Sequence, residues 1–115
     1  MVVNEASMKM KINKFTPKKV MGLINKNEIF VIDVRPKDFQ RDASFIKGSI
    51  HCPLLDLSDR VSEFPKDQKI LITDWAMRQS PLAAKYLIGH GYNVIGILKG
   101  GLERWKNDKY PVENR

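Results

Sequence analysis

Four short runs of apolar residues divide the chain, and polar segments separate them. The runs are IFVID at 29–33, SIHC at 49–52, ILIT at 70–73 and VIGIL at 94–98. IFVID is almost continuously apolar, which is the pattern of a strand that is covered on both faces. We therefore predict a strand from each run, and KINK at 11–14 adds a short edge strand.

The segments between the runs have helical features. Thr16-Pro17 places a capping hydroxyl directly before a proline, which favours a helix start, and apolar residues then fall on one face. Residues 54–64 have loosely helical apolar spacing and end at Pro65. Gly100-Gly101 precedes a last helical segment, in which we expect Trp105 to anchor the packing.

A further helix is predicted shortly after ILIT. Ser80 is expected to cap it, the helix covers residues 81–90, and Gly91 ends it in a left-handed conformation. Its inward-facing residues are predicted to be Leu82, Ala83, Tyr86 and Leu87. The loop between ILIT and this helix begins at Asp74, so a carboxylate stands where a strand gives way to a helix.

Strands that alternate with helices indicate an α/β fold, here a five-stranded parallel sheet with helices on both faces. In such a fold the ligand site lies at the carboxyl ends of the strands, which points to the loop after ILIT. We assign residues 11–115 to one domain and residues 1–10 to an N-terminal tail, because a chain of 115 residues fits a single core.

The net charge of +7 raises the question of an anionic partner. Part of it is concentrated in the N-terminal quarter, at Lys9, Lys11, Lys14, Lys18, Lys19 and Lys26. Surface lysine is common, and no alternation of aromatic and basic residues suggests a base-stacking surface. We interpret the lysines as a solvated face and consider nucleic acid an unlikely partner, with a modest preference for anionic ligands or partners.

Cysteine, histidine and apolar content limit the remaining classes. No apolar run is long enough to span a bilayer, and the first residues lack the apolar centre of a secretory signal, so we expect a cytoplasmic protein. The single Cys52 excludes an internal disulfide, and with His51 and His90 it offers too few ligands for a zinc cluster. We expect no metal or cofactor, an inert buried thiol and ordinary structural or surface histidines.

Four segments together resemble the rhodanese-like domains. They are VIDVRPKDF at 31–39, SFIKGSIHCPL at 44–54, the strand, loop and helix at 70–84, and GYNVIGILKGGLERW at 91–105. They occur in the order and spacing of that family and cover nearly the whole chain. The resemblance implies a five-stranded parallel sheet and one active-site loop between the fourth strand and its helix. The loop length is similar to that of the sulfur-transferring members and shorter than that of the related Cdc25-class phosphatases.

The resemblance also implies an activity that this loop departs from. Active members place a cysteine first in the loop and pass a sulfane sulfur, commonly from thiosulfate, through a cysteine persulfide to a thiophilic acceptor. Here that position is Asp74. Met77 stands where glycine is frequent, Gln79 where arginine is frequent, and Phe45 replaces a histidine frequent in the preceding motif.

The physical reason for a cysteine at this place also applies to a carboxylate. Loop N–H groups and the positive end of the following helix stabilise a thiolate, and they suit another anion equally. We expect the Asp74 oxygens to accept these N–H bonds and to fill the anion-binding loop. The loop residues are Trp75, Ala76, Met77, Arg78, Gln79 and Ser80. By the resemblance, Asp33 and Arg35 brace this region as scaffold.

Two functional hypotheses follow. The first is a rhodanese-like module without cysteine-dependent sulfurtransferase activity, which binds or regulates a partner protein or a small sulfur-containing anion. The second is a sulfurtransferase, active through Cys52 or in a parent sequence with cysteine at position 74. Asp74 as a general base or acyl nucleophile is a weaker alternative, because such chemistry needs partner groups that the loop does not offer. Arg78 could pair with Asp74, and Trp75 either packs over the loop or contacts a partner.

Overall fold

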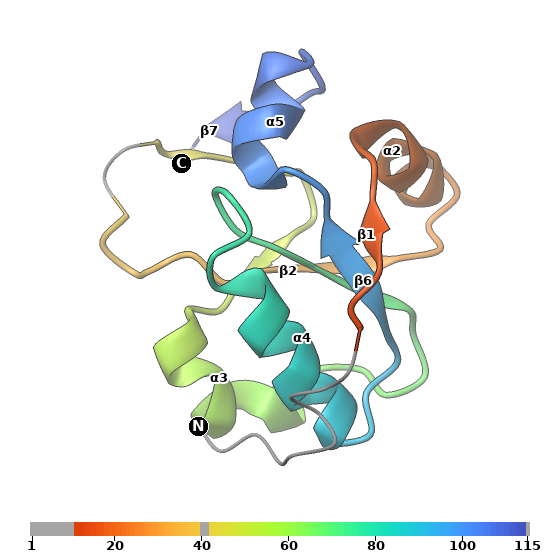
Figure 1. Cartoon of the computed structure of the whole chain (residues 1–115), viewed down its shortest axis with the longest axis vertical. Coiled ribbons are helices and arrows are strands. Elements are labelled where there is room, and N and C mark those ends of the chain that lie inside the picture. The colour runs from red at the N-terminus through yellow and green to blue at the C-terminus, as the bar shows by residue number, and fades with distance from the viewer. Residues whose placement is uncertain (1–10, 40–41, 115) are drawn as a thin grey trace.

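The computed structural model describes residues 11–39 and 42–114 (Figure 1). Five strands form one sheet in the order β1-β6-β5-β2-β4, and every pairing in it is parallel. The strands are β1 (Lys14–Phe15), β2 (Phe30–Asp33), β4 (Ile50–His51), β5 (Ile70–Thr73) and β6 (Val94–Leu98). The predicted five-stranded parallel sheet is confirmed. β1 lies at one edge of it, but only Lys14 of the predicted edge strand at 11–14 belongs to β1.

In the described part of the chain, four helices lie between the strands (Figure 1). They are α2 (Pro17–Asn25), α3 (Leu57–Arg60), α4 (Ser80–Gly89) and α5 (Gly101–Asn107). Two 3₁₀ turns, η1 (Leu54–Asp56) and η2 (Val61–Glu63), flank α3. Thr16 caps α2 as predicted, because its hydroxyl accepts a hydrogen bond from the N–H of Lys19 (N to O, 3.3 Å).

The helices cover both faces of the sheet because successive strand residues point to opposite sides. On one face, Val31, Leu71 and Leu98 pack with residues of α2 and α5, among them Trp105. On the other face, Ile32, Ile72 and Ile97 pack with residues of α3, η2 and α4. The predicted anchor Trp105 is fully buried, and its Nε1–H donates to the carbonyl of Pro111 (2.9 Å).

A second, two-stranded sheet was not predicted. It pairs β3 (Ser44–Phe45) with β7 (Glu113–Asn114) in antiparallel orientation. Each strand has two residues, which is too short for a period of two to show in the sequence. The pairing ties the C-terminal segment to the chain that precedes β4.

Two predictions about α4 were wrong. The helix begins at Ser80, its N-cap position is Gln79, and no side chain of the cap residue makes a capping bond. Ser80 therefore lies within the first turn, and its buried hydroxyl has no hydrogen-bond partner among the described residues. Leu82 was expected to face inward, but it is 45% exposed. Apolar residues often remain at the surface, so apolar character alone did not orient it.

Candidate functional site

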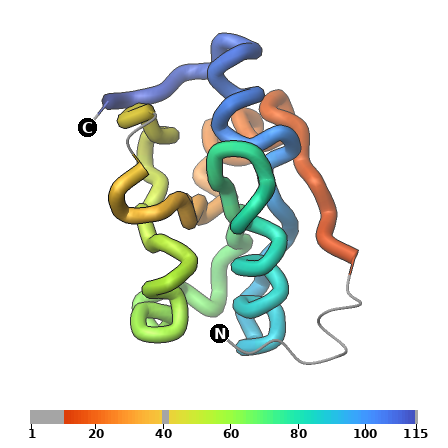
Figure 2. Tube along the Cα trace, turned by 60° about the vertical axis from the view of Figure 1, so that its left-hand side comes forward, coloured from red at the N-terminus to blue at the C-terminus, as the bar shows by residue number. Residues whose placement is uncertain are grey.

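The site lies in the loop that joins β5 to α4, residues 74–79, at the carboxyl edge of the sheet. Figure 2 shows this green loop standing above α4 and next to the start of α5. β5 is the middle strand of the sheet, so the loop opens between the two helical layers. This is the position at which parallel α/β folds bind ligands.

The Asp74 carboxylate is held by three backbone N–H groups of its own loop. Oδ1 accepts from the N–H of Met77 (2.7 Å), and Oδ2 accepts from those of Gln79 (2.6 Å) and Ser80 (3.1 Å). The predicted hydrogen bonds from the loop to Asp74 are therefore present. Because the last two donors belong to the start of α4, Asp74 supplies the cap that we had assigned to the Ser80 hydroxyl.

Asp74 is fully buried, yet no described cation pairs with it. Arg78, the expected partner, is exposed and forms no hydrogen bond or ion pair with the carboxylate in the described part of the chain. The negative charge is stabilised by the three convergent N–H groups and by the positive end of α4. This is the arrangement of an anion-binding cradle whose anion is part of the chain.

The first turn of α5 holds the loop from the outside. The N–H of Leu102 donates to the carbonyl of Asp74 (2.8 Å), and that of Glu103 donates to the carbonyl of Trp75 (3.0 Å). Gly101, at φ +64°, lies so close that a Cβ there would sit 2.3 Å from the Trp75 carbonyl oxygen. Local sequence showed only a glycine turn here, because the contact joins segments far apart along the chain.

The backbone conformation at Met77 explains why glycine is frequent at this position in the family that the chain resembles. Its φ is +63°, the left-handed region that residues with a Cβ rarely adopt. The side chain is half-buried against the core, and its sulfur accepts a hydrogen bond from the N–H of Gly100 (3.3 Å). Packing therefore offsets the backbone strain at this residue.

Trp75 and its neighbours form one wall of a cleft of about 480 Å³ beside the loop. The indole ring lies 5.7 Å from the ring of Phe39, and its Nε1–H donates to Glu103 (3.1 Å). Trp75 thus packs locally while half-exposed. Sequence reasoning missed Phe39 and Glu103, for which no local pattern was available. The cleft is lined by Arg35, Pro36, Asp38, Phe39, Trp75, Ala76, Arg78, Gln79 and Glu103.

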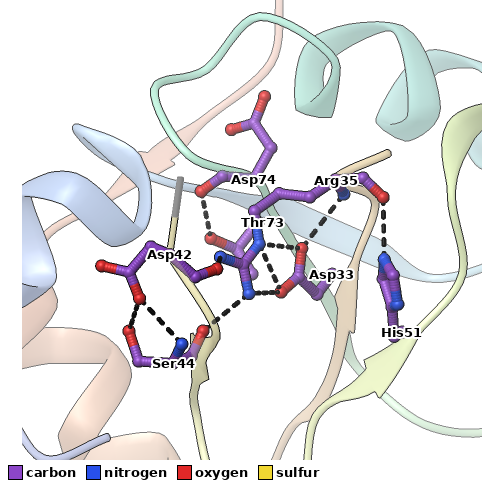
Figure 3. Close-up of polar contacts among 7 residues, drawn as sticks. All are labelled: Asp33, Arg35, Asp42, Ser44, His51, Thr73 and Asp74. Atoms are coloured by element: carbon purple, nitrogen blue, oxygen red, sulfur yellow. Dashed lines mark hydrogen bonds and ion pairs between the residues drawn. The ribbon is translucent and has the colours of Figure 1, made fainter. Parts of the chain in front are cut away.

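Asp33 and Arg35 form a buried ion pair at the end of β2 (Figure 3). Nη2 of Arg35 lies 2.7 Å from Oδ2 of Asp33 and also donates to the carbonyl of Ser44 (2.7 Å). Asp33 pairs in register with Thr73, the residue before the loop. The ion pair therefore joins β2 to β3 next to the start of the loop, and the scaffold role of the two residues stays a prediction.

Cys52 and the histidines lie apart from the loop chemistry. Cys52 is fully buried in the core, and burial raises the pKa of its thiol. Nε2 of His51 lies 2.8 Å from the carbonyl of Arg35, and Nδ1 of His90 lies 2.9 Å from that of Tyr86. These contacts are structural. No group of three metal-ligating side chains occurs among residues 11–39 and 42–114.

Comparison with known proteins identifies the family. The profile of the rhodanese-like domain matches residues 16–108, which include every strand of the main sheet except β1, and all four helices. The chain therefore belongs to the rhodanese-like domain family. In the described residues, no helix is long and apolar enough to cross a membrane.

Curated relatives include sulfurtransferases. The thiosulfate sulfurtransferase GlpE of Pseudomonas putida is 29% identical over 101 residues, which cover 87% of this chain and 89% of that protein. The adenylyltransferase and sulfurtransferase UBA4 of Candida albicans is 32% identical over 92 residues, 73% of this chain but 21% of that protein. The chain thus resembles single-domain sulfurtransferases along most of their length.

Solved structures share the fold. A rhodanese-related protein from Thermoplasma volcanium superposes with a TM-score of 0.79 at 23% identity, covering 88% of this chain and 97% of that one. The reduced CoADR-RHD protein of Bacillus anthracis superposes with a TM-score of 0.73 at 31% identity, covering 82% of this chain and 16% of that one. These likenesses confirm the predicted α/β fold.

Proposed function

We propose that this chain is a rhodanese-like binding module without cysteine-dependent sulfurtransferase activity. The observation on which the proposal depends is the set of three N–H groups that converge on Asp74. A substrate oxyanion or a persulfide anion in this loop would need the same donors. The Asp74 carboxylate therefore takes the place of a ligand.

The chemistry of sulfur transfer supports the proposal. In the family reaction a thiolate attacks the outer sulfur of the donor, a new S–S bond forms, and the rest of the donor leaves with its electron pair. The resemblance puts Asp74 at the position of that thiolate. A carboxylate is a hard, weak nucleophile toward sulfur and cannot store a persulfide, so the half-reaction has no acceptor in this loop.

Cys52 does not offer a substitute. It is the only cysteine of the chain, it is fully buried, and the raised pKa of its thiol keeps it protonated at neutral pH. It packs in the core with Ile32, Val34 and Leu57 and not in the cleft. A donor anion would have to open the core to reach it.

General-base chemistry at Asp74 is also disfavoured. Both carboxylate oxygens already accept N–H bonds, and full burial keeps them from the cleft. The acids that line the cleft are Asp38 and Glu103, and Glu103 is engaged by the Trp75 indole. No second carboxylate is hydrogen-bonded to Asp74, so the paired groups that proton transfer needs are missing from the described residues.

The cleft beside the loop is the surface that remains for binding. Its walls combine the aromatic rings of Phe39 and Trp75 with the exposed cation of Arg78. Half-exposed aromatic rings beside a cation are typical of protein recognition surfaces. We expect a partner protein here, or a small sulfur-containing anion held without covalent transfer. The place of action is expected to be the cytoplasm.

The test compares thiocyanate formation from thiosulfate and cyanide by the unaltered chain and by Asp74→Cys. The unaltered chain is expected to give no turnover above buffer. Asp74→Cys is expected to give partial activity, because the same N–H groups would lower the pKa of the introduced thiol. The gain stays partial since Met77 and Gln79 differ from the residues frequent in active members.

The matched control is Cys52→Ser in both backgrounds. It should leave the activity of Asp74→Cys unchanged and the unaltered chain inactive. Clear turnover by the unaltered chain would overturn the proposal. If Cys52→Ser then abolished that turnover, the active residue would be Cys52.

A further inference from the structure

The edge of the molecule formed by β1 and the start of α2 is strongly and uniformly basic. Residues 11–27 contain five lysines and no acid. Four of these lysines surround β1 and the first turn of α2. Lys99 follows β6 beside them, and its backbone N–H donates to the carbonyl of Phe15 (2.8 Å). We call this set the basic edge, and all of its members are exposed: Lys11, Lys14, Lys18, Lys19 and Lys99.

The charges of the basic edge are not compensated within the described chain. None of the five lysines forms an ion pair with another described residue. Lys18 and Lys19 lie in the first turn of α2, which has no acidic residue, so they face the positive end of the helix dipole. Such an arrangement is locally unfavourable for folding. Departures from local rules of this kind are expected where a surface serves binding.

The open edge of the sheet adds to the case. β1 is the last strand in the order, and among the described strands it pairs with β6 alone. Figure 1 shows β1 and α2 close together at one side of the molecule. Edge strands are places where another chain can dock, and lysines on an edge select against partners that are not acidic.

We propose that the basic edge is a docking surface for an acidic protein partner. Charge complementarity favours this partner, because five like charges that form no ion pair with the described residues attract an acidic surface and repel a basic one. The proposal goes beyond the function proposed for the loop and does not depend on whether Asp74 abolishes catalysis.

A protein fits this surface better than a nucleic acid does. Every cation of the basic edge is a lysine, whereas the planar fork of arginine is the preferred phosphate ligand. The nearest aromatic ring, Phe15, is half-buried, lies below the Lys19 ammonium (5.0 Å) and packs on Gly96. It therefore offers no free face on which a base could stack.

Part of the basic edge, including Lys18 and Lys99, lies at the carboxyl ends of the strands, where the loop of Asp74 begins. Lys18 follows β1, Lys99 follows β6, and the loop of Asp74 follows β5, which are neighbouring strands in the sheet. Adjacent strands are about 4.8 Å apart, so the loop begins roughly 10 Å from the end of β1. A partner on Lys18 and Lys99 would thus lie at the same edge of the sheet as this loop.

The test is a titration of the isotopically labelled full chain with a synthetic peptide of alternating glutamate and serine, followed by amide chemical shifts. Shifts are expected to concentrate at residues 11–20 and at Lys99. The affinity is expected to fall roughly tenfold or more between about 50 and 200 mM salt. A single-stranded oligonucleotide of equal charge is the competing probe, and tighter binding of it would overturn the choice of a protein.

Two triple variants that change the net charge by the same amount separate the effect of the basic edge from that of the net charge. The first is Lys14→Glu, Lys18→Glu and Lys99→Glu, and the control is Lys37→Glu, Lys47→Glu and Lys69→Glu, at exposed lysines elsewhere. The first is expected to weaken peptide binding at least about tenfold, and the control less than about threefold. Equal losses in both, or shifts spread evenly over the surface, would overturn the proposal.

A folding measurement makes the test independent of the peptide. The variant Lys18→Glu alone is expected to raise the melting temperature slightly, because an acid at the start of α2 suits the helix dipole. A lower melting temperature would show that Lys18 stabilises the fold, which would remove the argument that this charge is kept for binding.

Discussion

Removal of the Asp74 carboxylate is expected to destabilise the protein substantially. Asp74→Ala leaves the N–H groups of Met77, Gln79 and Ser80 without their acceptor. Hydrogen bonds to charged groups contribute about 1.5 to 3 kcal/mol each, and unsatisfied buried donors add to the loss. Met77 and Gln79 are half-exposed, so water replaces part of what is lost. We expect the free energy of unfolding to fall by about 3 to 5 kcal/mol.

Asp74→Asn separates the charge from the shape of the side chain. An amide has one acceptor oxygen, so it can keep the two bonds from Gln79 and Ser80 but turns its NH₂ toward the N–H of Met77. The expected loss lies between zero and that of Asp74→Ala. If Asp74→Asn were as stable as the unaltered chain, one acceptor oxygen would be enough to hold the loop.

Urea unfolding followed by tryptophan fluorescence measures these differences. The control is Asp108→Ala, which removes an exposed carboxylate that lies 3.3 Å from Arg104. Its expected loss is less than about 1 kcal/mol, as for other surface ion pairs. The reasoning would be refuted if Asp74→Ala were destabilised no more than Asp108→Ala.

Three further predictions concern the surroundings of the loop. Met77→Gly should be more stable than Met77→Ala by about 1 kcal/mol in urea unfolding. Both variants lose the methionine side chain, but only glycine adopts φ +63° without backbone strain. The reverse order of stability would show that the backbone at this position is not strained. Gly101→Ala should lower the free energy of unfolding by more than about 3 kcal/mol, because its Cβ would clash with the Trp75 carbonyl. Gly48→Ala has a positive φ but open space around it, so it should lower the free energy by about 1 kcal/mol. Similar losses in both variants would show that the clash is not the cause. Asp42 has a pKa lowered to about 2, since hydrogen bonds from groups that include Lys106 outweigh burial, which raises it. The Asp42 carboxylate therefore adds to the free energy of unfolding above about pH 4, and this contribution is lost as the pH falls through 2. Lys106→Met should make the loss of stability between these pH values smaller and should cost about 1 kcal/mol at neutral pH. An unchanged loss of stability at acid pH would contradict the pairing.

The main sheet was predictable because its strands are buried on both faces. ILIT and VIGIL match β5 and β6 to the residue, and IFVID exceeds β2 by one residue. Continuous apolar runs result from this double burial, so they mark such strands in any sequence. β3 and β7 have two residues each, and most of these residues are at least half-exposed, so no continuous apolar run marks them in the sequence.

The content of the site was predictable in part. The position of Asp74 at a strand-to-helix switch predicted an anion among N–H groups, and the three bonds are present. The assignment of the cap to Ser80 failed because local rules consider only nearby side chains, whereas the loop folds a carboxylate back over six residues.

Contacts between distant segments could not be predicted from the sequence. The first turn of α5 fixes the loop through Gly101 and two backbone hydrogen bonds, and Glu103 binds the Trp75 indole. These contacts depend on how the β6–α5 connection packs beside β5. No periodicity in either segment records that arrangement.

Intact-mass spectrometry of the purified chain after incubation with thiosulfate tests the central claim most directly. With oxygen atoms of Asp74 occupying the cradle and Cys52 buried, the polypeptide should keep the mass that its sequence dictates. Asp74→Cys, treated in parallel, should gain one sulfur atom that a reducing agent removes. A stable gain of one sulfur atom by the unaltered chain would contradict the account.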